Sequence, residues 1–277
     1  MRWRISLALI LAASAGCADP LTFVRATTLA GDVREFGGLS AIEMQDPDSA
    51  IVLSDRGQAF VLKFDRSTGA ITVARMDQPR PDRDSEGLAY AAGRLYFSYE
   101  GPAEIAAQSG PAIEPHPDFA TLPPNRSLEA LAGDADGTLY VLPERAVGKD
   151  GVFPIYRYRD KVWDIPGHMP KTGLFLPTGA DIGPDGLLYV LERALSPFGF
   201  RTQIRRVDPN APESKAEILL NTYPGQHDNL EGLAIWQSDS GATCLLMVSD
   251  DNFRAIQRSE LVEYALTETL ADGAHCD

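Results

Sequence analysis

Short apolar segments that alternate with polar turns run along almost the whole chain. In the first such unit, apolar runs at residues 39–44, 51–54 and 59–64 are separated by turns that contain Asp, Pro, Gly and Arg. Later units carry Asp136-Gly137 and Asp185-Gly186, dipeptides that are typical of hairpin turns with positive φ. No long segment after the N-terminal region has the period of a helix. The pattern predicts an all-β domain.

These units repeat with a nearly constant spacing. Their starts lie at residues 37, 86, 129, 179 and 231, which are 49, 43, 50 and 52 residues apart. Units of this length that are built from short strands are the signature of a β-propeller. We predict five four-stranded blades, in which the segment 21–29 supplies the fourth strand of the last blade and closes the ring. A six-bladed propeller is the alternative, because the insertions at 101–126 and 146–177 have room for further strands.

The N-terminal region has the order of an export signal. Arg2 and Arg4 precede an apolar run at residues 5–15, and small residues follow this run. The run is too short to span a bilayer as a helix. We therefore predict a signal at residues 1–18, with cleavage after Ala15 or Ala18, and a single propeller domain at residues 19–277.

Two forms of export fit this signal. Soluble release would place the protein in the periplasm or outside the cell. Alternatively, Ser14-Ala15-Gly16-Cys17 is similar to a lipoprotein box, in which Cys17 would carry a lipid, although such boxes usually have Leu in place of Ser14. A lipid on Cys17 is the only membrane contact that the sequence predicts. A buried N-terminal helix is the third alternative.

The chain has three cysteines. If Cys17 is removed or lipidated, Cys244 and Cys276 remain, which is an even number in an oxidising compartment. We expect these two to form a disulfide that ties the C-terminal tail to the last repeat, and two separate buried thiols are the alternative. The sequence has no C-x-x-C spacing, which argues against a structural zinc site.

The charge of the chain restricts its partners. The formal net charge is −14, so the protein repels nucleic acid and anionic lipid unless its acids are screened or bind cations. Aromatic residues make up 8% of the chain and do not alternate with basic runs, which is a further argument against nucleic acid binding. A metal ion or a cationic ligand is the natural partner, and we expect a monomer.

Acids occupy equivalent places in the repeats. An acid ends the second strand of every unit, namely Asp55, Glu100, Glu144, Glu192 and Asp250. An arginine directly follows three of these acids, as Arg56, Arg145 and Arg193. Further acids stand at or near the start of the first strands, namely Glu86, Glu129, Asp181 and Glu231. Because equivalent positions of a propeller form a ring around its axis, we expect these acids to converge on the central channel or on one of its mouths.

Crowded carboxylates need a neutralising partner, because they repel one another by several kcal/mol at an effective dielectric constant of about 20. One alternative is internal: the arginines form ion pairs, and backbone N–H groups donate hydrogen bonds to the glutamates. The other alternative is a hard cation, since Ca²⁺ takes about six to eight oxygen ligands. We expect each single acid to be structural and the set as a whole to hold at least one divalent ion.

Several segments together resemble a known family. GGLSAIEM…LSDRG, DSEGLAY, SLEALAG, VLERA and NLEGLAIW…VSDDNF are similar to the phytase-like family called "esterase-like activity of phytase", which consists of exported bacterial β-propeller proteins. The resemblance covers residues 33–266 and implies an ester or phosphoester hydrolase. The matching positions are Asp55, Arg56, Glu86, Glu129, Glu192, Arg193, Glu231, Asp250 and Asn252. The sequence departs from the family pattern at Gly179-Ala180-Asp181, where Glu-Gly-Leu is expected, and at Ala130, where Gly is expected.

The resemblance also implies roles for individual residues. In a calcium-assisted phosphoester hydrolase, carboxylates hold the ions, and the ions bind the phosphate and activate water. On this sequence the implied metal ligands are Asp55, Glu86, Glu129, Glu231 and Asp250. Arg56 and Arg193 would contact the phosphate of a small-molecule ester or would form ion pairs, and no general base is assigned. The alternative function is a non-catalytic propeller that binds a small ligand or a protein partner, with the acids and arginines stabilising the scaffold.

Other catalytic residues have weak support. His227 is the only histidine beside a motif and could transfer a proton, and a solvated loop histidine is the alternative. Because the sequence has no G-x-S-x-G, a serine hydrolase would depend on Ser40 alone, and a strand hydroxyl that is bonded to the backbone is the alternative. The absence of G-x-G-x-x-G and of G-K-[ST] argues against dinucleotide and P-loop sites.

Overall fold

The computed structural model describes residues 19–29, 33, 35–78, 80–81, 83–125, 127–147, 151–211, 215–254, 256–270 and 273–276. The predicted signal at residues 1–18, including Cys17, lies outside the described residues. Strands dominate the described part, which also has two short 3₁₀ helices, η1 (Pro117–Thr121) and η2 (Thr267–Thr269). No helix in this part of the chain is long and apolar enough to cross a membrane.

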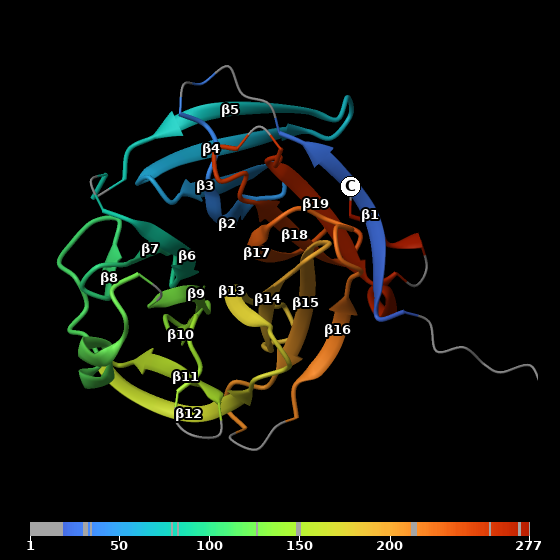
Figure 1. The fold of residues 1–277 in the computed structure, drawn as a ribbon. Coiled ribbons are helices and arrows are strands. Elements are labelled where there is room, and N and C mark those ends of the chain that lie inside the picture. The colour runs from blue at the N-terminus through green and yellow to red at the C-terminus, as the bar shows by residue number, and fades with distance from the viewer. Residues whose placement is uncertain are drawn as a thin grey trace, which may run out of the picture.

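Five antiparallel sheets stand around a central axis, which confirms the predicted five-bladed propeller (Figure 1). The strands of the first blade, from the axis outward, are β2 (Leu39–Asp46), β3 (Ser49–Ser54), β4 (Gln58–Asp65) and β5 (Ala70–Met76). Those of the second are β6 (Ser85–Ala91), β7 (Arg94–Tyr99) and β8 (Glu104–Ala107). Those of the third are β9 (Leu128–Gly133), β10 (Leu139–Pro143), β11 (Val152–Arg159) and β12 (Val162–Pro170).

The fourth and fifth blades complete the ring. The strands of the fourth blade are β13 (Leu176–Ile182), β14 (Leu188–Ser196), β15 (Gly199–Val207) and β16 (Glu217–Asn221). Those of the fifth are β17 (Leu230–Gln237), β18 (Thr243–Ser249), β19 (Glu260–Leu266) and β1 (Leu21–Thr28). The predicted closure by the N-terminal strand is therefore confirmed, with Leu21 opposite Leu266 and Thr28 opposite Glu260. Strand β1 covers the outer edge of β19, which would otherwise be an open edge.

The second blade differs from the other four. Its sheet has three strands, and the place of the fourth is taken by a bridge between Ala106 and Ala112 and by a hydrogen bond from the N–H of Ile113 to the carbonyl of Ile105 (2.8 Å). The chain then forms η1, whose Phe119 is buried against Tyr156 of β11. The insertion at 101–126 therefore fills the outer side of this blade and its boundary with the third blade.

The inner strands β2, β6, β9, β13 and β17 contact one another in this order around the axis, and β17 contacts β2 (Figure 1). They approach so closely that side chains do not fit at some positions. A Cβ on Gly232 of β17 would come within 2.7 Å of the backbone nitrogen of Ile42 in β2. A Cβ on Gly179 of β13 would come within 2.5 Å of the carbonyl oxygen of Glu231. The glycines of the repeat motif thus allow the inner strands to close around a narrow channel.

Apolar side chains fill the space between neighbouring blades. At the boundary between the fifth and first blades, Val248 of β18 packs in one cluster with Val52 of β3 and Phe60 of β4. Every residue of β3 and of β18 is buried, because both faces of a middle strand contact a neighbouring blade. This explains why the sequence shows continuous apolar runs at these strands rather than alternation. Burial of each large apolar side chain contributes roughly 1.5–3 kcal/mol.

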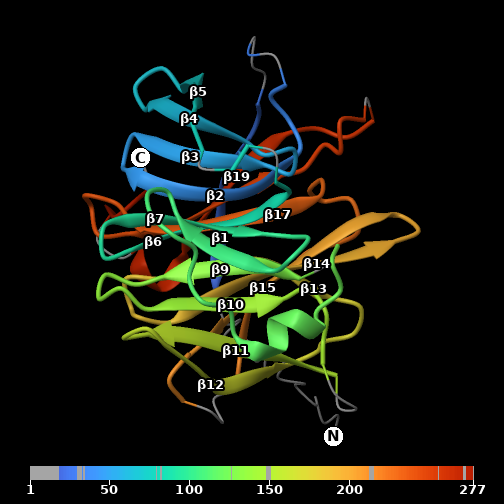
Figure 2. The same ribbon diagram turned by 90° about the vertical axis from the view of Figure 1, so that its left-hand side faces the viewer.

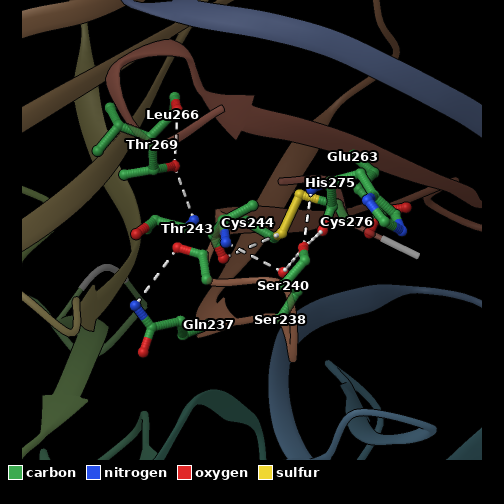
Figure 3. The surroundings of a disulfide bond; sticks show 12 residues. Gln237, Ser238, Ser240, Thr243, Cys244, Glu263, Leu266, Thr269, His275 and Cys276 are labelled. Atoms are coloured by element: carbon green, nitrogen blue, oxygen red, sulfur yellow. Dashed lines mark hydrogen bonds between the residues drawn. A yellow bond between two sulfur atoms is a disulfide. The ribbon is translucent and has the colours of Figure 1, made fainter. Parts of the chain in front are cut away.

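A disulfide joins the C-terminal tail to the fifth blade (Figure 3). Cys244 at the start of β18 is bonded to Cys276, with a Cα–Cα distance of 5.8 Å. The same tail is held by Ser240, whose hydroxyl donates to the carbonyl of His275 (2.8 Å) and accepts from its N–H (2.8 Å). The disulfide joins the two cysteines, Cys244 and Cys276, that the sequence analysis expected to be bonded.

Candidate metal and anion site at the propeller mouth

The inner strands begin, and the second strands end, at the same end of the central channel, because the two strands are antiparallel in every blade. We call this end the mouth. Near its start each inner strand has a β-bulge, at which the pairing passes over one residue. The five bulge residues are Ser40, Glu86, Glu129, Thr178 and Glu231. All of them except Glu231 line a cavity of about 10 Å³ on the axis, which is close to the space of one water molecule.

This strand register corrects the alignment of the repeats made from sequence. The sequence motif matches Gly37 and Gly179 to Glu86, whereas the pairing matches Ser40 and Thr178 to Glu86. Two of the five bulge positions therefore carry a hydroxyl instead of a carboxylate. Asp181 lies three residues beyond Thr178 in β13, and its carboxylate accepts hydrogen bonds from the N–H groups of Ile235 (2.6 Å) and Ile182 (2.7 Å).

A second set of equivalent residues follows the second strands. The N–H groups of Asp55, Glu100, Glu144 and Asp250 each donate to a carbonyl just before the bulge of the same blade, those of Gly38, Asp84, Ser127 and Asn229. In the fourth blade the residue at this register position is Arg193, which pairs with Leu176. Glu192, which the sequence alignment placed in this set, instead forms a buried ion pair with Arg205 of β15 (Oε2–Nε 2.6 Å).

Arg193 therefore stands among acids from neighbouring blades. Its Nη1 donates to Oδ1 of Asn229 (2.7 Å) and forms an ion pair with Glu231, and its Nη2 lies 3.9 Å from Oε1 of Glu144. The side-chain amide of Asn229 also donates to Glu231 (2.8 Å) and to Asp250 (3.2 Å). The fourth-blade arginine thus neutralises acids of the third and fifth blades.

The second blade carries the closest group of acids. Single carboxylate oxygens of Asp84, Glu86 and Glu100 all lie within 4.8 Å of one another. Burial is the largest cause of the raised pKa values of Glu86 and Glu129, and the charge of Asp84 contributes to the raised pKa of Glu86 and that of Glu100 to the raised pKa of Glu129.

Two buried hydroxyls also belong to the mouth. Thr178 is 2% exposed and lines the axial cavity with Glu86 and Glu129, and its Oγ1 has no hydrogen-bond partner among the described residues. Ser127 is 1% exposed, occupies the same register position as Asp84 and Asn229, and its Oγ likewise has no partner in the described part. Buried polar atoms are almost always bonded to protein or to water. These hydroxyls are therefore available to a ligand at the mouth.

Burial at the mouth raises the pKa values of three acids, Asp55, Glu100 and Glu231. Burial, followed by the charges of Asp250 and Asp84, raises the pKa of Asp55 to about 6. Burial raises the pKa of Glu100 to about 7, although the N–H of Ser127 donates to its Oε1 (2.7 Å). Burial also raises the pKa of Glu231 to about 7, against the favourable charge of Arg193.

The two remaining bulge glutamates show the strongest effect. Burial, and then the charges of neighbouring acids, raise the pKa values of Glu86 and Glu129 well above the usual range. At neutral pH such a site holds protons that a divalent cation would displace, so cation binding should release protons and should strengthen as pH rises.

Aromatic and basic residues form part of the rim. The guanidinium of Arg56 stacks 3.5 Å from the ring centroid of Phe253, and a Cβ on Gly38 would touch the same ring. Asp251 fixes this loop, because its carboxylate accepts hydrogen bonds from the N–H groups of Gly38 (2.9 Å) and Phe253 (3.0 Å). Arg56 is exposed, so its charge faces solvent beside Asp55.

The sequence profile of one family matches most of the propeller. The profile described as "Phytase-like: Esterase-like activity of phytase" matches residues 34–253, which include both sets of equivalent mouth residues. The chain belongs to the phytase-like family. A comparison with curated protein sequences finds no match.

Solved structures similar to this phytase-like chain share its fold at low sequence identity. Glutaminyl cyclase from Myxococcus xanthus has a TM-score of 0.51 and 13% identity, with 88% of this chain and 95% of that chain covered. The β-fructofuranosidase BmSUC1 from Bombyx mori has a TM-score of 0.50 and 12% identity, with 86% and 61% covered. The calcium-binding protein regucalcin from Agrobacterium tumefaciens has a TM-score of 0.47 and 14% identity, with 83% and 78% covered. These similarities show the fold alone.

The mouth of this phytase-like propeller suits a hard cation. Its donors are carboxylate and hydroxyl oxygens, which are the ligands that Ca²⁺ prefers. Among the predicted metal ligands, Glu86 belongs to the closest group, and Asp55, Glu129, Glu231 and Asp250 line the same mouth. The acidic cluster is compatible with a metal ion.

Three residues of the mouth were not among the predicted ligands. Asp84 and Glu100 complete the group around Glu86, and Asn229 orients Arg193. The sequence contains a signal for Asp84 and Asn229, since each stands two residues before a bulge glutamate, in Asp84-Ser85-Glu86 and in Asn229-Leu230-Glu231.

His227 and Ser40 have local partners. His227 is buried, at 7% exposure, and not a solvated loop residue, and its Nε2 lies 2.8 Å from the hydroxyl of Tyr264. Burial lowers the pKa of His227, and the ring stacks on Phe23 of β1. Its contacts are thus with the outer strands of the fifth blade. The hydroxyl of Ser40 donates to the carbonyl of Ser85 (3.1 Å), as expected for a strand hydroxyl bonded to the backbone.

Proposed function

We propose that this phytase-like propeller is an ester or phosphoester hydrolase that depends on a divalent cation, with Ca²⁺ as the first candidate. The observation that carries this proposal is the convergence of equivalent acids from the first, second, third and fifth blades on one mouth, together with Arg193 from the fourth. Burial raises the pKa values of Asp55, Glu86 and Glu231, and raised pKa values are common among acids at a catalytic or metal site.

Asp84, Glu86 and Glu100 are the residues best placed to hold the cation, with Glu129 and Asp55 beside them. When bound there, a divalent cation polarises a carbonyl or phosphoryl oxygen and activates water. The reaction itself is a hydrolysis, in which the oxygen of water bonds to the carbon or phosphorus centre, the ester bond breaks, and the alcohol leaves with a proton.

Arg193 has a different role in this proposal. Its guanidinium is fixed by Asn229 and Glu231, so it presents its charge at the mouth in one orientation. An arginine held in this way binds carboxylate or phosphate oxygens and favours the negative charge that develops during ester hydrolysis. Arg56, which is exposed and stacked on Phe253, supplies a second positive charge at the rim.

The test is a hydrolysis assay with p-nitrophenyl phosphate and p-nitrophenyl acetate in the presence of Ca²⁺. We expect turnover that EDTA abolishes and that added Ca²⁺ restores. Absence of turnover on both substrates, with a melting temperature that EDTA does not change, would refute the proposal.

The second candidate is a non-catalytic propeller that binds a small ligand or a protein partner. The ion pairs of Arg193 and the hydrogen bond from Ser127 to Glu100 favour it, because both link neighbouring blades. On this alternative, replacing the mouth acids by Asn or Gln reduces stability, and neither the wild type nor the variants hydrolyse esters.

We further propose that the protein is an exported monomer, released in soluble form or anchored through a lipid on Cys17. The order of residues in the N-terminal segment and the Cys244–Cys276 disulfide support export, because disulfides persist in oxidising compartments. Mass spectrometry of the protein from a bacterial envelope fraction distinguishes cleavage after Ala18 from a lipid on Cys17, and an intact N-terminus in the cytoplasm would refute export.

A further inference from the structure

Exposed apolar side chains gather on the mouth side of two blades. Large apolar side chains that are at least 67% exposed number five among the described residues, and these are Leu174, Leu195, Phe198, Tyr223 and Ile256. Strand directions place all five at the mouth end, where β12, β14, β16 and β18 end. Leu195 lies near the end of β14, and the other four lie in the loops that follow these strands. We call these residues the apolar rim.

The most prominent part of the apolar rim projects from the fourth blade. Strands β14 and β15 continue three residue pairs beyond Arg193, from Ala194–Arg201 to Ser196–Gly199, and this hairpin extends past the neighbouring blades (Figure 2). Phe198 at its tip is 83% exposed and Leu195 is 67% exposed. Arg193 lies at the base of the same hairpin, where its guanidinium is 5.9 Å from the ring of Phe200.

A second loop supports this hairpin. The N–H of Gly225 donates to the carbonyl of Phe200 (2.8 Å), and a Cβ on Gly199 would come within 3.1 Å of Gly225. Tyr223, which is 81% exposed, therefore lies on a loop in direct contact with the hairpin that carries Phe198. The rim is held in place by backbone contacts, so its aromatic side chains are exposed on a fixed support.

The closest group of acids lies on a blade that carries no residue of the apolar rim. The group Asp84, Glu86 and Glu100 belongs to the second blade, whereas the apolar rim belongs to the loops that border the fourth and fifth blades. Arg193 lies at the base of the hairpin that carries Leu195 and Phe198, and it contacts acids on both sides, Glu144 of the third blade and Glu231 of the fifth. A ligand that spans the mouth would thus contact polar groups at one end and apolar groups at the other.

We propose that the apolar rim binds the hydrocarbon part of an amphiphilic ester, a molecule with one polar head at Arg193 and the acids and an acyl chain over Phe198 and Tyr223. This inference rests on the proposed hydrolase function and names its substrate class. It excludes a compact polyphosphate as the preferred substrate, because such a molecule would leave the exposed side chains of the apolar rim without a partner.

The arrangement favours a single molecule over a bilayer. The rim borders only one side of the mouth, so a flat surface resting on it would also meet the acids of the second blade. Those acids and the net charge of −14 oppose contact with anionic lipid. Exposed apolar side chains next to a polar cavity are a common property of ligand sites.

The substrate test compares p-nitrophenyl esters of acetate, butyrate and octanoate with inositol hexakisphosphate, all with Ca²⁺. Because each buried methylene group favours binding, we expect kcat/KM to rise about twofold to threefold per added methylene. Phosphate release from inositol hexakisphosphate should be slower than octanoate hydrolysis. A preference for the polyphosphate, or equal values for acetate and octanoate, would overturn the proposal.

The matched variants are Phe198→Ser with Tyr223→Ser, and the control Val162→Ser. Val162 is also exposed, at 65%, but lies at the far end of the third blade. The double variant should lower kcat/KM for octanoate about tenfold and the value for acetate far less, and the control should change neither. An equal loss on acetate and octanoate would overturn the proposal.

A binding measurement separates this inference from the hydrolase function. The fluorescent fatty acid 11-(dansylamino)undecanoic acid should bind the full chain, and the double variant should weaken its binding about tenfold. Such binding without hydrolysis of any ester would refute the hydrolase and keep the amphiphile site. Unchanged binding of the probe in the double variant would overturn the site. The site would also be overturned if vesicle binding or self-association depended on Phe198 and Tyr223 and binding of the probe did not.

Discussion

Arg193 of the fourth blade and Glu231 of the fifth form an ion pair at the mouth of the propeller. The pair places an arginine at the register position where the other four blades carry an acid. Asn229 contacts both partners, through its Oδ1 to Arg193 and through its amide to Glu231. The position of the Arg193 guanidinium therefore depends on Asn229 and Glu231 of the neighbouring fifth blade.

The substitution Glu231→Gln tests whether this pair serves catalysis or the scaffold. We expect kcat to fall at least about tenfold, because Arg193 loses the anchor that orients it. The melting temperature should change by only a few degrees, because Glu144 and Asn229 still contact the guanidinium. Steady-state kinetics and thermal unfolding measure both quantities. A large fall in melting temperature with unchanged kcat would favour the scaffold role.

The double substitution Asp84→Asn with Glu100→Gln should weaken Ca²⁺ binding about tenfold or more. It removes two of the three carboxylates whose oxygens lie within 4.8 Å of one another. Isothermal titration with Ca²⁺ gives the affinity. The control is Asp48→Asn, since the Asp48 side chain is 72% exposed and lies at the opposite end of the first blade. Equal Ca²⁺ affinity in the double variant and the wild type would show that the ion binds at another site.

Without divalent cations, stability should fall as pH rises from about 4 to about 7. Burial raises the pKa of Asp55 to about 6 and those of Glu100 and Glu231 to about 7, so the folded protein holds protons that the unfolded chain has released. The state that binds more protons is favoured at low pH, which gives the folded state its advantage there. Urea unfolding in EDTA across this range measures the trend.

Calcium provides the control for this pH dependence. A bound cation replaces the protons, so saturating Ca²⁺ should remove most of the loss of stability near pH 7. Stability that increases between pH 4 and 7 in EDTA would contradict the raised pKa values.

Reduction of the Cys244–Cys276 disulfide should lower the free energy of unfolding by roughly 3–4 kcal/mol, because the bond closes a loop with a sequence separation of 32. Urea unfolding with and without dithiothreitol measures this difference. The Cys276→Ser variant is the control, and dithiothreitol should not change its unfolding. If the oxidised and reduced proteins unfold at the same urea concentration, the tail makes no contribution to stability.

The fold was predictable because its signals are local. The apolar runs at β3 and β18 and the turn dipeptides Asp136-Gly137 and Asp185-Gly186 each mark a strand or a hairpin without reference to distant residues. The regular spacing of these signals was enough to predict five blades and closure by β1.

The site was predictable only in part, because the position of a bulge depends on the partner strand. Ser40 and Thr178 share the register of Glu86, although no similarity of side chain connects them. Arg193 and Glu192 are adjacent in sequence, and only the pairing of β13 with β14 shows which of them faces the mouth. The raised pKa values and the unpartnered hydroxyl of Thr178 arise from burial, which no single motif encodes.

The pairing of β1 with β19 has a consequence for how the chain matures. Leu21 pairs with Leu266, so β1 finds its partner only after the chain through β19 has been made. Contacts between such distant residues form slowly, because a long loop must close before they can form. Until then β1 lacks its partner strand, and a product truncated before β19 would leave β1 free to pair with other chains.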